Sequence, residues 1–368
     1  MPPQRTILTP SRAQSSYHQA PPKQRSNAKE SSPSTSSRVA NSWTPWKAPS
    51  KRFSHGSVGL HEEIEDFYAW IVGTPAEARM RQHVVDEISA LIKRLYPAAK
   101  VDTFGSFKTG LYLPNSDLDL IVFGKWQQLP FVSLQEELIK TRICTREGVK
   151  ILDKTTVPIL KITHEYTGLK VDVSFNMVNG INTATYLNNF ASNYPCMPKL
   201  FLLLKQYLYQ RDLNEVFTGG ISSYALAVML INFLQQHPRM HANDGTHLNL
   251  GVLLLEFLDL YGTHFNYNTT TIRCQGRGSY ITKEQMRLMM QNGQRPGLLS
   301  IEDPVQPGHD ICQSMFGAME VKQAFEYGFR VLNHAIMDPS AKHNGILDRL
   351  IKVAKVDIEF REWVNKEF

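Results

Sequence analysis

Two aspartates separated by one residue, inside a short apolar segment, restrict the fold of this chain more than any other feature. Asp119 lies in the run 118–123, whose β-branched and aromatic residues predict a strand, and Asp117 immediately precedes this run. Side chains two residues apart on a strand share one face, about 7 Å apart, so both carboxylates face the same side of a sheet. Because burying two like charges together is costly, this arrangement favours a site for hard divalent cations.

A third acid occurs later in a segment of the same character. Asp172 lies between Val171 and Val173 in the run 169–175, which also predicts a strand. An aspartate flanked by β-branched residues is expected to point inward from a strand that adjoins the first. Three carboxylates at one place suit two Mg²⁺ ions about 3.5 to 4 Å apart, which clamp an attacking and a leaving oxygen.

The pair Gly105-Ser106 stands just before a helix expected over 107–112. Its backbone N–H groups and the Ser106 hydroxyl are placed to hold phosphate oxygens, and glycine permits close approach to the backbone. A D-x-D pattern alone arises by chance, and a Gly-Ser pair alone is usually a turn. The order of the whole set, with the later strand aspartate, is what makes it specific.

The chain divides into three expected parts. Residues 1–55 are rich in Ser, Pro, Gln and Lys and predict a disordered basic tail. Residues 56–180 predict an α/β catalytic domain, with strands over 101–104, 118–123, 157–163 and 169–175 and a capping box at Thr74 opening a helix. Residues 181–368 predict a mainly helical domain, with helices near 197–210, 221–236, 250–260, 318–336 and 345–354. The fold class is therefore α+β with a mixed sheet.

Charge, cysteine content and apolar length limit the compartments in which such a chain is expected. The first 55 residues carry nine Lys or Arg against the single acid Glu30, a charge of +8, so the net charge of +6 for the whole chain leaves about −2 for the rest. Such a tail can neutralise RNA phosphates, or it can serve only as a solubilising terminus. Four scattered cysteines contain no C-x-x-C pair, and the longest apolar stretch, about 200–204, is far too short to span a membrane. We expect a soluble intracellular protein.

The arrangement Gly105-Ser106, Asp117-x-Asp119 and Asp172 resembles the signature of the DNA polymerase β nucleotidyltransferase superfamily. Within it, the run 104–126 is similar to the catalytic segment of TRAMP-type (Trf-like) poly(A) RNA polymerases, and so are 60–68, 211–221 and 301–304. The resemblance extends from about Trp43 to the C-terminus. It implies a polymerase β-like catalytic domain followed by a helical central (PAP-associated) domain, with a nucleotide-recognition loop at 301–310.

The resemblance also implies chemistry: template-independent addition of AMP from ATP to RNA 3′ ends. Asp117, Asp119 and Asp172 would bind two Mg²⁺ or Mn²⁺ ions, and Asp172 would also orient the RNA 3′-hydroxyl for in-line attack. Positioning and charge neutralisation would supply most of the catalysis. A β-type DNA repair polymerase shares the carboxylates, but no helix-hairpin-helix is recognisable here.

Further residues match nucleotide contacts of the family, each with a plainer alternative. Gly105 and Ser106 would hold phosphates, Lys205 would bind the triphosphate unless it is a snorkelling side chain, and Ser223 would cap its helix and contact phosphate. Tyr224 would stack on the base unless it only packs in the core. Asn182 and Thr183 would contact the ribose unless they merely begin a helix.

The recognition loop leaves the choice of base open. It contains Asp303 and His309, and His309 stands where adenylating relatives carry Asn and uridylating relatives carry His; Gln313 replaces a nearby family Arg. Three functions stay in competition: an adenylyltransferase, a terminal uridylyltransferase, and a catalytically silent RNA-binding scaffold.

The expected partners follow from the resemblance. No zinc-finger, RRM or KH signature appears, and relatives work with a zinc-knuckle RNA-binding protein and an RNA helicase that feeds the nuclear exosome. From the resemblance and from Lys/Arg-rich patches such as Lys47–Arg52 we expect a nuclear protein (nucleoplasm or nucleolus) acting on noncoding RNA, with the cytoplasm as the alternative. The sequence does not give tail length, RNA targets or oligomeric state.

Overall fold

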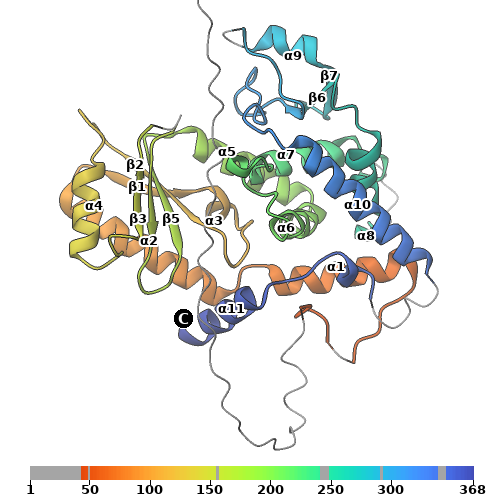
Figure 1. Ribbon diagram of the computed structural model, residues 1–368, viewed down its shortest axis with the longest axis horizontal. Coiled ribbons are helices and arrows are strands. Elements are labelled where there is room, and N and C mark those ends of the chain that lie inside the picture. Colours follow the sequence, from red (N-terminus) through yellow and green to blue (C-terminus); the bar gives the residue numbers. More distant parts are fainter. Residues whose placement is uncertain (1–42, 49, 155–156, 241–247, 291–292, 339–344) are drawn as a thin grey trace, which may run out of the picture. The chain divides into compact units, whose positions relative to one another are not determined.

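The computed structural model describes residues 43–48, 50–154, 157–240, 248–290, 293–338 and 345–368 (Figure 1). Most of the expected disordered tail, residues 1–42, lies outside the described residues. Trp46 is described and buried, with its ring edge-on to Phe67 at 5.0 Å between centroids.

Two long helices open the described chain, α1 (Gly56–Ile71) and α2 (Pro75–Leu95). The capping box expected at Thr74 is confirmed: its hydroxyl accepts from the Glu77 N–H at 3.2 Å, and the Glu77 carboxylate accepts from the Thr74 N–H at 2.7 Å. These reciprocal bonds satisfy N–H groups that a helix start otherwise leaves unpaired.

A five-stranded sheet follows, in the order β1-β2-β5-β4-β3. Its strands are β1 (Lys100–Phe104), β2 (Leu118–Phe123), β3 (Val149–Leu152), β4 (Ile159–Thr163) and β5 (Lys170–Phe175). The pair β2–β5 is parallel and the other pairs are antiparallel, so the predicted mixed sheet is confirmed. Strand β3 was not predicted from the sequence; it has only four residues and lies at the edge of the sheet.

Short helices complete this half of the chain, α3 (Gly105–Thr109) and α4 (Phe131–Lys140). The helix expected over 107–112 thus begins at Gly105. Figure 1 shows α2 and α4 beside the sheet, and α11 (Lys355–Glu367) packs against α2 with Val364 in the core of the sheet half. The last helix of the chain therefore returns to the first domain.

The helical half contains α5 (Asn179–Asn193), α6 (Cys196–Tyr209), α7 (Ser223–Gln236), α8 (Leu250–Asp259) and α10 (Ala318–Met337). Its core also includes Leu60, Ile64 and Phe67 of α1, which packs on α6 and α8. A small sheet, β7-β6-β8, is formed by Ser279–Thr282, Thr270–Arg273 and Ser300–Ile301, beside α9 (Lys283–Met289). Strands this short carry too little periodicity to be read from sequence.

The helix expected over 345–354 was wrong. Only a 3-10 turn, Leu347–Arg349, forms there, and the chain then runs on without helical structure to α11. Gln210 donates to the Leu350 carbonyl (2.7 Å) and accepts from the Lys352 N–H (2.8 Å), and Gln206 donates to the Lys352 carbonyl (3.1 Å). Tertiary hydrogen bonds replace the helical ones.

None of the helices in the described ranges is long and apolar enough to cross a bilayer.

Candidate active site

The two central aspartates are neighbours across the parallel strand pair. Asp119 of β2 is the direct register partner of Asp172 of β5. Adjacent strands lie about 4.8 Å apart, and register partners point to the same face. Asp117 immediately precedes β2, on the same alternation as Asp119. The sheet thus assembles the carboxylates expected from sequence.

Gly105 is fixed by this arrangement. It begins α3 with φ +62°, a conformation that L side chains rarely adopt, and a Cβ there would lie 2.2 Å from Asp119 Oδ2. Its neighbour Phe104 is the register partner of Asp119 in the antiparallel β1–β2 pair. The Gly-Ser turn is therefore in direct contact with the carboxylate pair, and Ser106 follows at the start of α3.

Negative charge accumulates at this face. Burial raises the pKa of Asp119 to about 7, with repulsion from Asp172 and Asp117 adding to the shift. Burial also raises the pKa of Asp172, although its ion pair with Lys161 opposes the change. Lys205 and Lys161 lower the pKa of Asp119, but by less than burial and the two other acids raise it. Divalent cations fit this set of hard oxygen donors.

One carboxylate oxygen is already engaged. Lys161 of β4, the register partner of Asp172, places Nζ 2.7 Å from Asp172 Oδ2. Within the described residues, no three Asp, Glu, His or Cys side chains converge at coordination distance. A divalent cation that binds Asp172 Oδ2 would therefore have to displace the Lys161 ammonium from that oxygen.

Lys205 lies in the interior beneath the aspartates. It is 7% exposed on α6, and Nζ donates to the Leu111 carbonyl at 3.2 Å. Burial lowers its pKa to about 8, against the attraction of Asp119 and Asp117. The side chain does not reach outward to solvent as a snorkelling lysine does.

Arg81 was not singled out from the sequence. It is fully buried on α2, stacks on Tyr112 with 4.5 Å from Cζ to the ring centroid, and donates to the Pro114 carbonyl at 3.0 Å. It therefore holds the loop that leads into Asp117. The available signal was its position: Glu77 and Arg81 are charged residues four apart on the apolar stripe of α2.

The recognition loop meets α7 through three predicted residues. Tyr224 donates from its hydroxyl to Asp303 Oδ1 at 2.7 Å, and His309 Nδ1 lies 3.8 Å from Asp303 Oδ2. Burial raises the pKa of Tyr224, and Asp303 raises it further, while a hydrogen bond with Thr183 opposes the shift. Thr183 of α5 thus lies at the same cluster.

Other predicted residues are placed differently. The N-cap of α7 is Ser222, which accepts from the Ala225 N–H at 3.1 Å, and Ser223 is the first helical residue. The expectation that Ser223 caps the helix was wrong by one position. Asn182 is exposed on α5. Asp310, missed from sequence, is buried and accepts from the N–H groups of Gly297, Ile301 and Cys312, which shapes the loop.

Comparison with protein families gives two matches. A family described as "Poly(A) RNA polymerase, mitochondrial-like, central palm domain" matches residues 60–192, and "Cid1 family poly A polymerase" matches residues 249–309.

Among individual proteins, the chain is 38% identical over 336 residues to the inactive non-canonical poly(A) RNA polymerase protein Trf4-2 of Drosophila melanogaster, covering 89% of this chain and 83% of that one. It is 36% identical to the poly(A) RNA polymerase cid14 of Schizosaccharomyces pombe, over 78% of this chain and 42% of the relative. The chain thus spans less than half of cid14.

Among solved structures, the polymerase core of TRAMP, an RNA surveillance complex, superposes with a TM-score of 0.71 at 31% identity, covering 83% of this chain and 96% of that core. The Cid1 poly(U) polymerase superposes with a TM-score of 0.65 at 21% identity, over 80% and 98%. That second likeness concerns the fold alone.

Proposed function

This chain belongs to the Trf4 and Cid14 family of non-canonical poly(A) RNA polymerases, and from that premise we propose that it adds AMP from ATP to RNA 3′ ends without a template. The observation that carries the proposal is the direct pairing of Asp119 with Asp172, with Asp117 on the same alternation. The arrangement of the aspartates matters because one relative, Trf4-2, is named inactive, so family membership alone does not establish catalysis. This chain retains all three acids, and two of them, Asp119 and Asp172, are register partners on adjacent strands.

The carboxylates have a defined task in this proposal. Asp117, Asp119 and Asp172 would hold two Mg²⁺ or Mn²⁺ ions, which supply charge stabilisation to the attacking and leaving oxygens. Asp172 would also orient the RNA 3′-hydroxyl towards the α-phosphorus. Lys205 would lie against the triphosphate, while Gly105 and Ser106 present N–H groups and a hydroxyl to its phosphates.

The choice of ATP rests on the relatives named poly(A) RNA polymerases. Tyr224, tied to Asp303, would form the platform for the base, and Thr183 and Asn182 would reach the ribose. His309 favours a second candidate, uridylyl transfer, because uridylating relatives carry His at this position; its imidazole lies 3.8 Å from Asp303 Oδ2 in the same cluster.

A competition assay tests activity and base choice together. Purified protein with Mg²⁺, an unstructured RNA primer and single NTPs should extend the primer with ATP, and Asp119→Asn should not. Preferential use of UTP would select the uridylyltransferase. Equal inactivity of wild type and Asp119→Asn with every NTP and either metal would leave the RNA-binding scaffold.

We also propose a setting like that of TRAMP: a nuclear protein that acts on noncoding RNA beside a zinc-knuckle RNA-binding protein and an RNA helicase. The support is the likeness to the TRAMP core and the basic residues near Lys47–Arg52. Affinity purification from nuclear and cytoplasmic fractions tests it. Recovery of neither partner class, with the protein confined to the cytoplasm, would refute it.

A further inference from the structure

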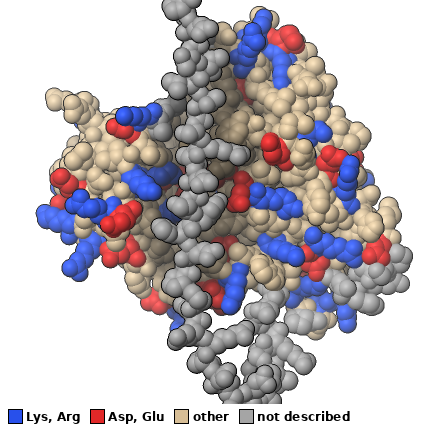
Figure 2. Space-filling view, in the orientation of Figure 1, with Lys and Arg blue, Asp and Glu red and all other residues tan. Residues whose placement is uncertain are grey.

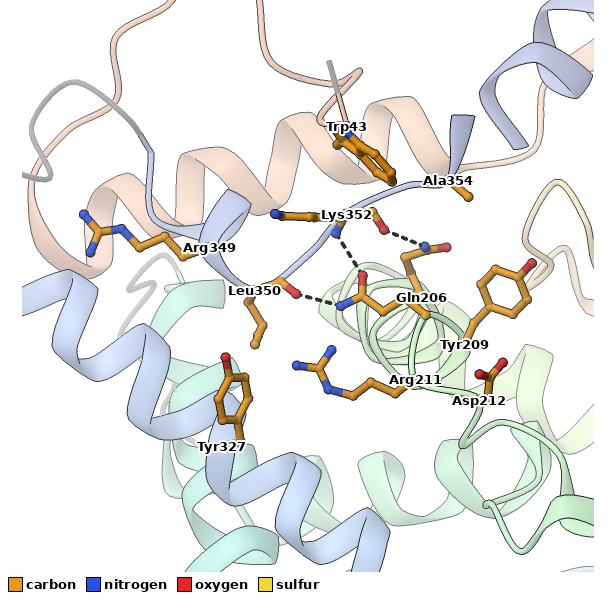
Figure 3. Close-up of a pocket in the computed structure, with 11 residues that line it drawn as sticks. Trp43, Gln206, Tyr209, Arg211, Asp212, Tyr327, Arg349, Leu350, Lys352 and Ala354 are labelled. Carbon is orange, nitrogen blue, oxygen red and sulfur yellow. Dashed lines mark hydrogen bonds between the residues drawn. The ribbon is translucent and has the colours of Figure 1, made fainter. Parts of the chain in front are cut away.

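A cavity of about 520 Å³ lies outside the group of catalytic aspartates, at the C-terminal end of α6 (Figure 3). Its volume is in the range that small-molecule and cofactor sites occupy. Figure 3 shows side chains from α6, from α10 and from the segment after the Leu347–Arg349 turn around one space. It is lined by Trp43, Gln206, Tyr209, Gln210, Arg211, Asp212, Tyr327, Arg349, Leu350, Lys352 and Ala354.

The lining combines rings with positive charge. Tyr327 and Trp43 are 53% and 59% exposed, so part of each ring remains open to a ligand. Arg211 lies against two rings, with Cζ 4.1 Å from the Tyr207 centroid and 5.3 Å from that of Tyr327. Three cations, including Lys352, face a single acid, Asp212. Aromatic faces interleaved with cations are the means by which proteins bind single-stranded nucleic acid.

Two of the cations are available. Among the described residues, neither Arg211 nor Lys352 forms an ion pair with a carboxylate, whereas Arg349 pairs with Asp338 at 3.3 Å. The backbone around Lys352 is held by Gln206 and Gln210, so this wall of the cavity is fixed before a ligand arrives. A rigid, charged wall lowers the cost of ordering a bound chain.

The cavity adjoins the loop that leads into Asp117. Arg211 lies two residues beyond the end of α6 and six residues after Lys205, a step of about 9 Å at the rise of a helix. Asn115, two residues before Asp117, hydrogen-bonds Tyr209 on the cavity wall. RNA leaving the catalytic carboxylates would need only a few nucleotides, at about 3.4 Å each, to cover such a distance.

We infer that this cavity is an accessory site for the RNA strand upstream of its 3′ end, with a base stacked on Tyr327 or Trp43 and phosphates near Arg211 and Lys352. The inference rests on RNA being the substrate, as proposed above. The chain's own residues 1–42 are a poorer occupant, because their six Lys and Arg and one acid would meet like charge.

Surface charge elsewhere supports a local site. Over the face shown in Figure 2, Lys and Arg alternate with Asp and Glu and form no continuous basic surface among the described residues. Trp43 is also the residue that follows the basic segment 1–42 in the chain. Accessory RNA contacts on that face would have to come from discrete places of this kind.

The test compares RNA lengths in the catalytically inactive Asp119→Asn background. Tyr327→Ala combined with Lys352→Gln removes one ring and one cation from exposed positions, and fluorescence anisotropy measures binding of labelled oligo(A). RNA of about 20 nucleotides can reach both sites, whereas RNA of about 5 nucleotides is held mainly at the catalytic site, given about 3.4 Å per nucleotide.

We expect affinity for the long RNA to fall about tenfold, as loss of one stacking platform and one phosphate contact predicts. Its log affinity against log salt should become shallower by about 0.7, for the one cation removed. Affinity for the short RNA should be unchanged. The matched control is Tyr166→Ala with Lys140→Gln, an exposed ring and an exposed lysine in the sheet half, which should leave both affinities unchanged.

An equal loss of affinity for both RNA lengths, or no loss of affinity for the long RNA, would overturn the inference. A cavity that binds a protein partner and not RNA would give the second result. Thermal melting of both double variants confirms that the fold is intact. The binding measurement needs no turnover, so it is independent of the NTP assay. If no NTP is incorporated but RNA binding still depends on length in the expected way, the proposed catalysis is refuted and the accessory RNA site is not.

Discussion

Lys161 holds Asp172 from the neighbouring strand, Nζ to Oδ2 at 2.7 Å. The two residues are register partners in the β4–β5 pair, so the sheet itself fixes the contact. The pair leaves Asp172 with a countercharge at the oxygen that a divalent cation would otherwise share. Lys161 is thus a resident cation at the edge of the site.

Replacing Lys161 by Gln should increase affinity for Mn²⁺. Removal of one positive charge near the carboxylates should favour a divalent ion by about tenfold, because the Lys161 side chain is 42% exposed and its Coulomb repulsion is largely screened by water. Electron paramagnetic resonance titration of free Mn²⁺ measures this without turnover. Lys161→Arg should behave like wild type, and equal affinities in all three proteins would show that the ion pair does not compete with metal.

Metal-free protein should lose stability as pH rises from about 4 to about 7. The pKa of Asp119 is raised in the folded state to about 7. Over this interval the unfolded chain releases the Asp119 proton while the folded protein still holds it, so the free energy of unfolding falls as pH rises. Asp119→Asn should make this slope shallower and stabilise the protein by about 1 to 3 kcal/mol at neutral pH, after discounting for solvent screening. The slope should not vanish, because burial also raises the pKa of Glu63 to about 7 and the pKa of Asp172. Urea unfolding at several pH values measures the slope; an unchanged slope in Asp119→Asn would contradict the prediction.

Lys205 should make ATP binding weaken above about pH 8. Its pKa is lowered to about 8 by burial, so the ammonium that we propose to bind the triphosphate is lost as pH rises through that value. The KM for ATP should rise there more than kcat falls. Lys205→Met should show a high KM at every pH, and a wild-type KM that does not change as pH rises through the pKa would exclude the triphosphate role.

Gly105→Ala should abolish nucleotide addition and destabilise the fold by about 1 to 3 kcal/mol. The new Cβ combines a positive φ with a 2.2 Å approach to Asp119 Oδ2. Gly110 is the matched control, with φ +72° and no atom within 4 Å of the place where a Cβ would lie, so Gly110→Ala should cost only the backbone strain, about 1 kcal/mol. Thermal unfolding and primer extension compare the two. Equal behaviour would show that contact with the carboxylates is unimportant.

His309→Asn should shift the ratio of kcat/KM towards ATP and away from UTP. The imidazole lies 3.8 Å from Asp303 Oδ2, and Asp303 also accepts from Tyr224, so the change acts at the cluster proposed to read the base. A difference of one hydrogen-bonding contact amounts to about 1 to 3 kcal/mol, or roughly 5- to 150-fold in the ratio. His264→Asn, an exposed histidine in the helical half, should leave the ratio unchanged.

By itself the sequence determined the local features whose cause is local. The strand periodicity around Asp117 and Asp119, the capping box of Thr74 and Glu77, and the order of the Gly-Ser turn before the acids are all readable over a few residues. Each depends on alternation or on hydrogen bonds within one turn of chain, and the mixed α+β fold follows from their order.

Only the tertiary structure decided which distant residues meet. Lys161 pairs with Asp172 because β4 and β5 are adjacent, Arg81 reaches the loop before Asp117 from another helix, and the segment after Leu350 is extended because Gln206 and Gln210 bind its backbone. These contacts depend on sheet order and helix packing, and the free energy that selects them comes from burial and pairing across the whole chain, which no short window of sequence contains.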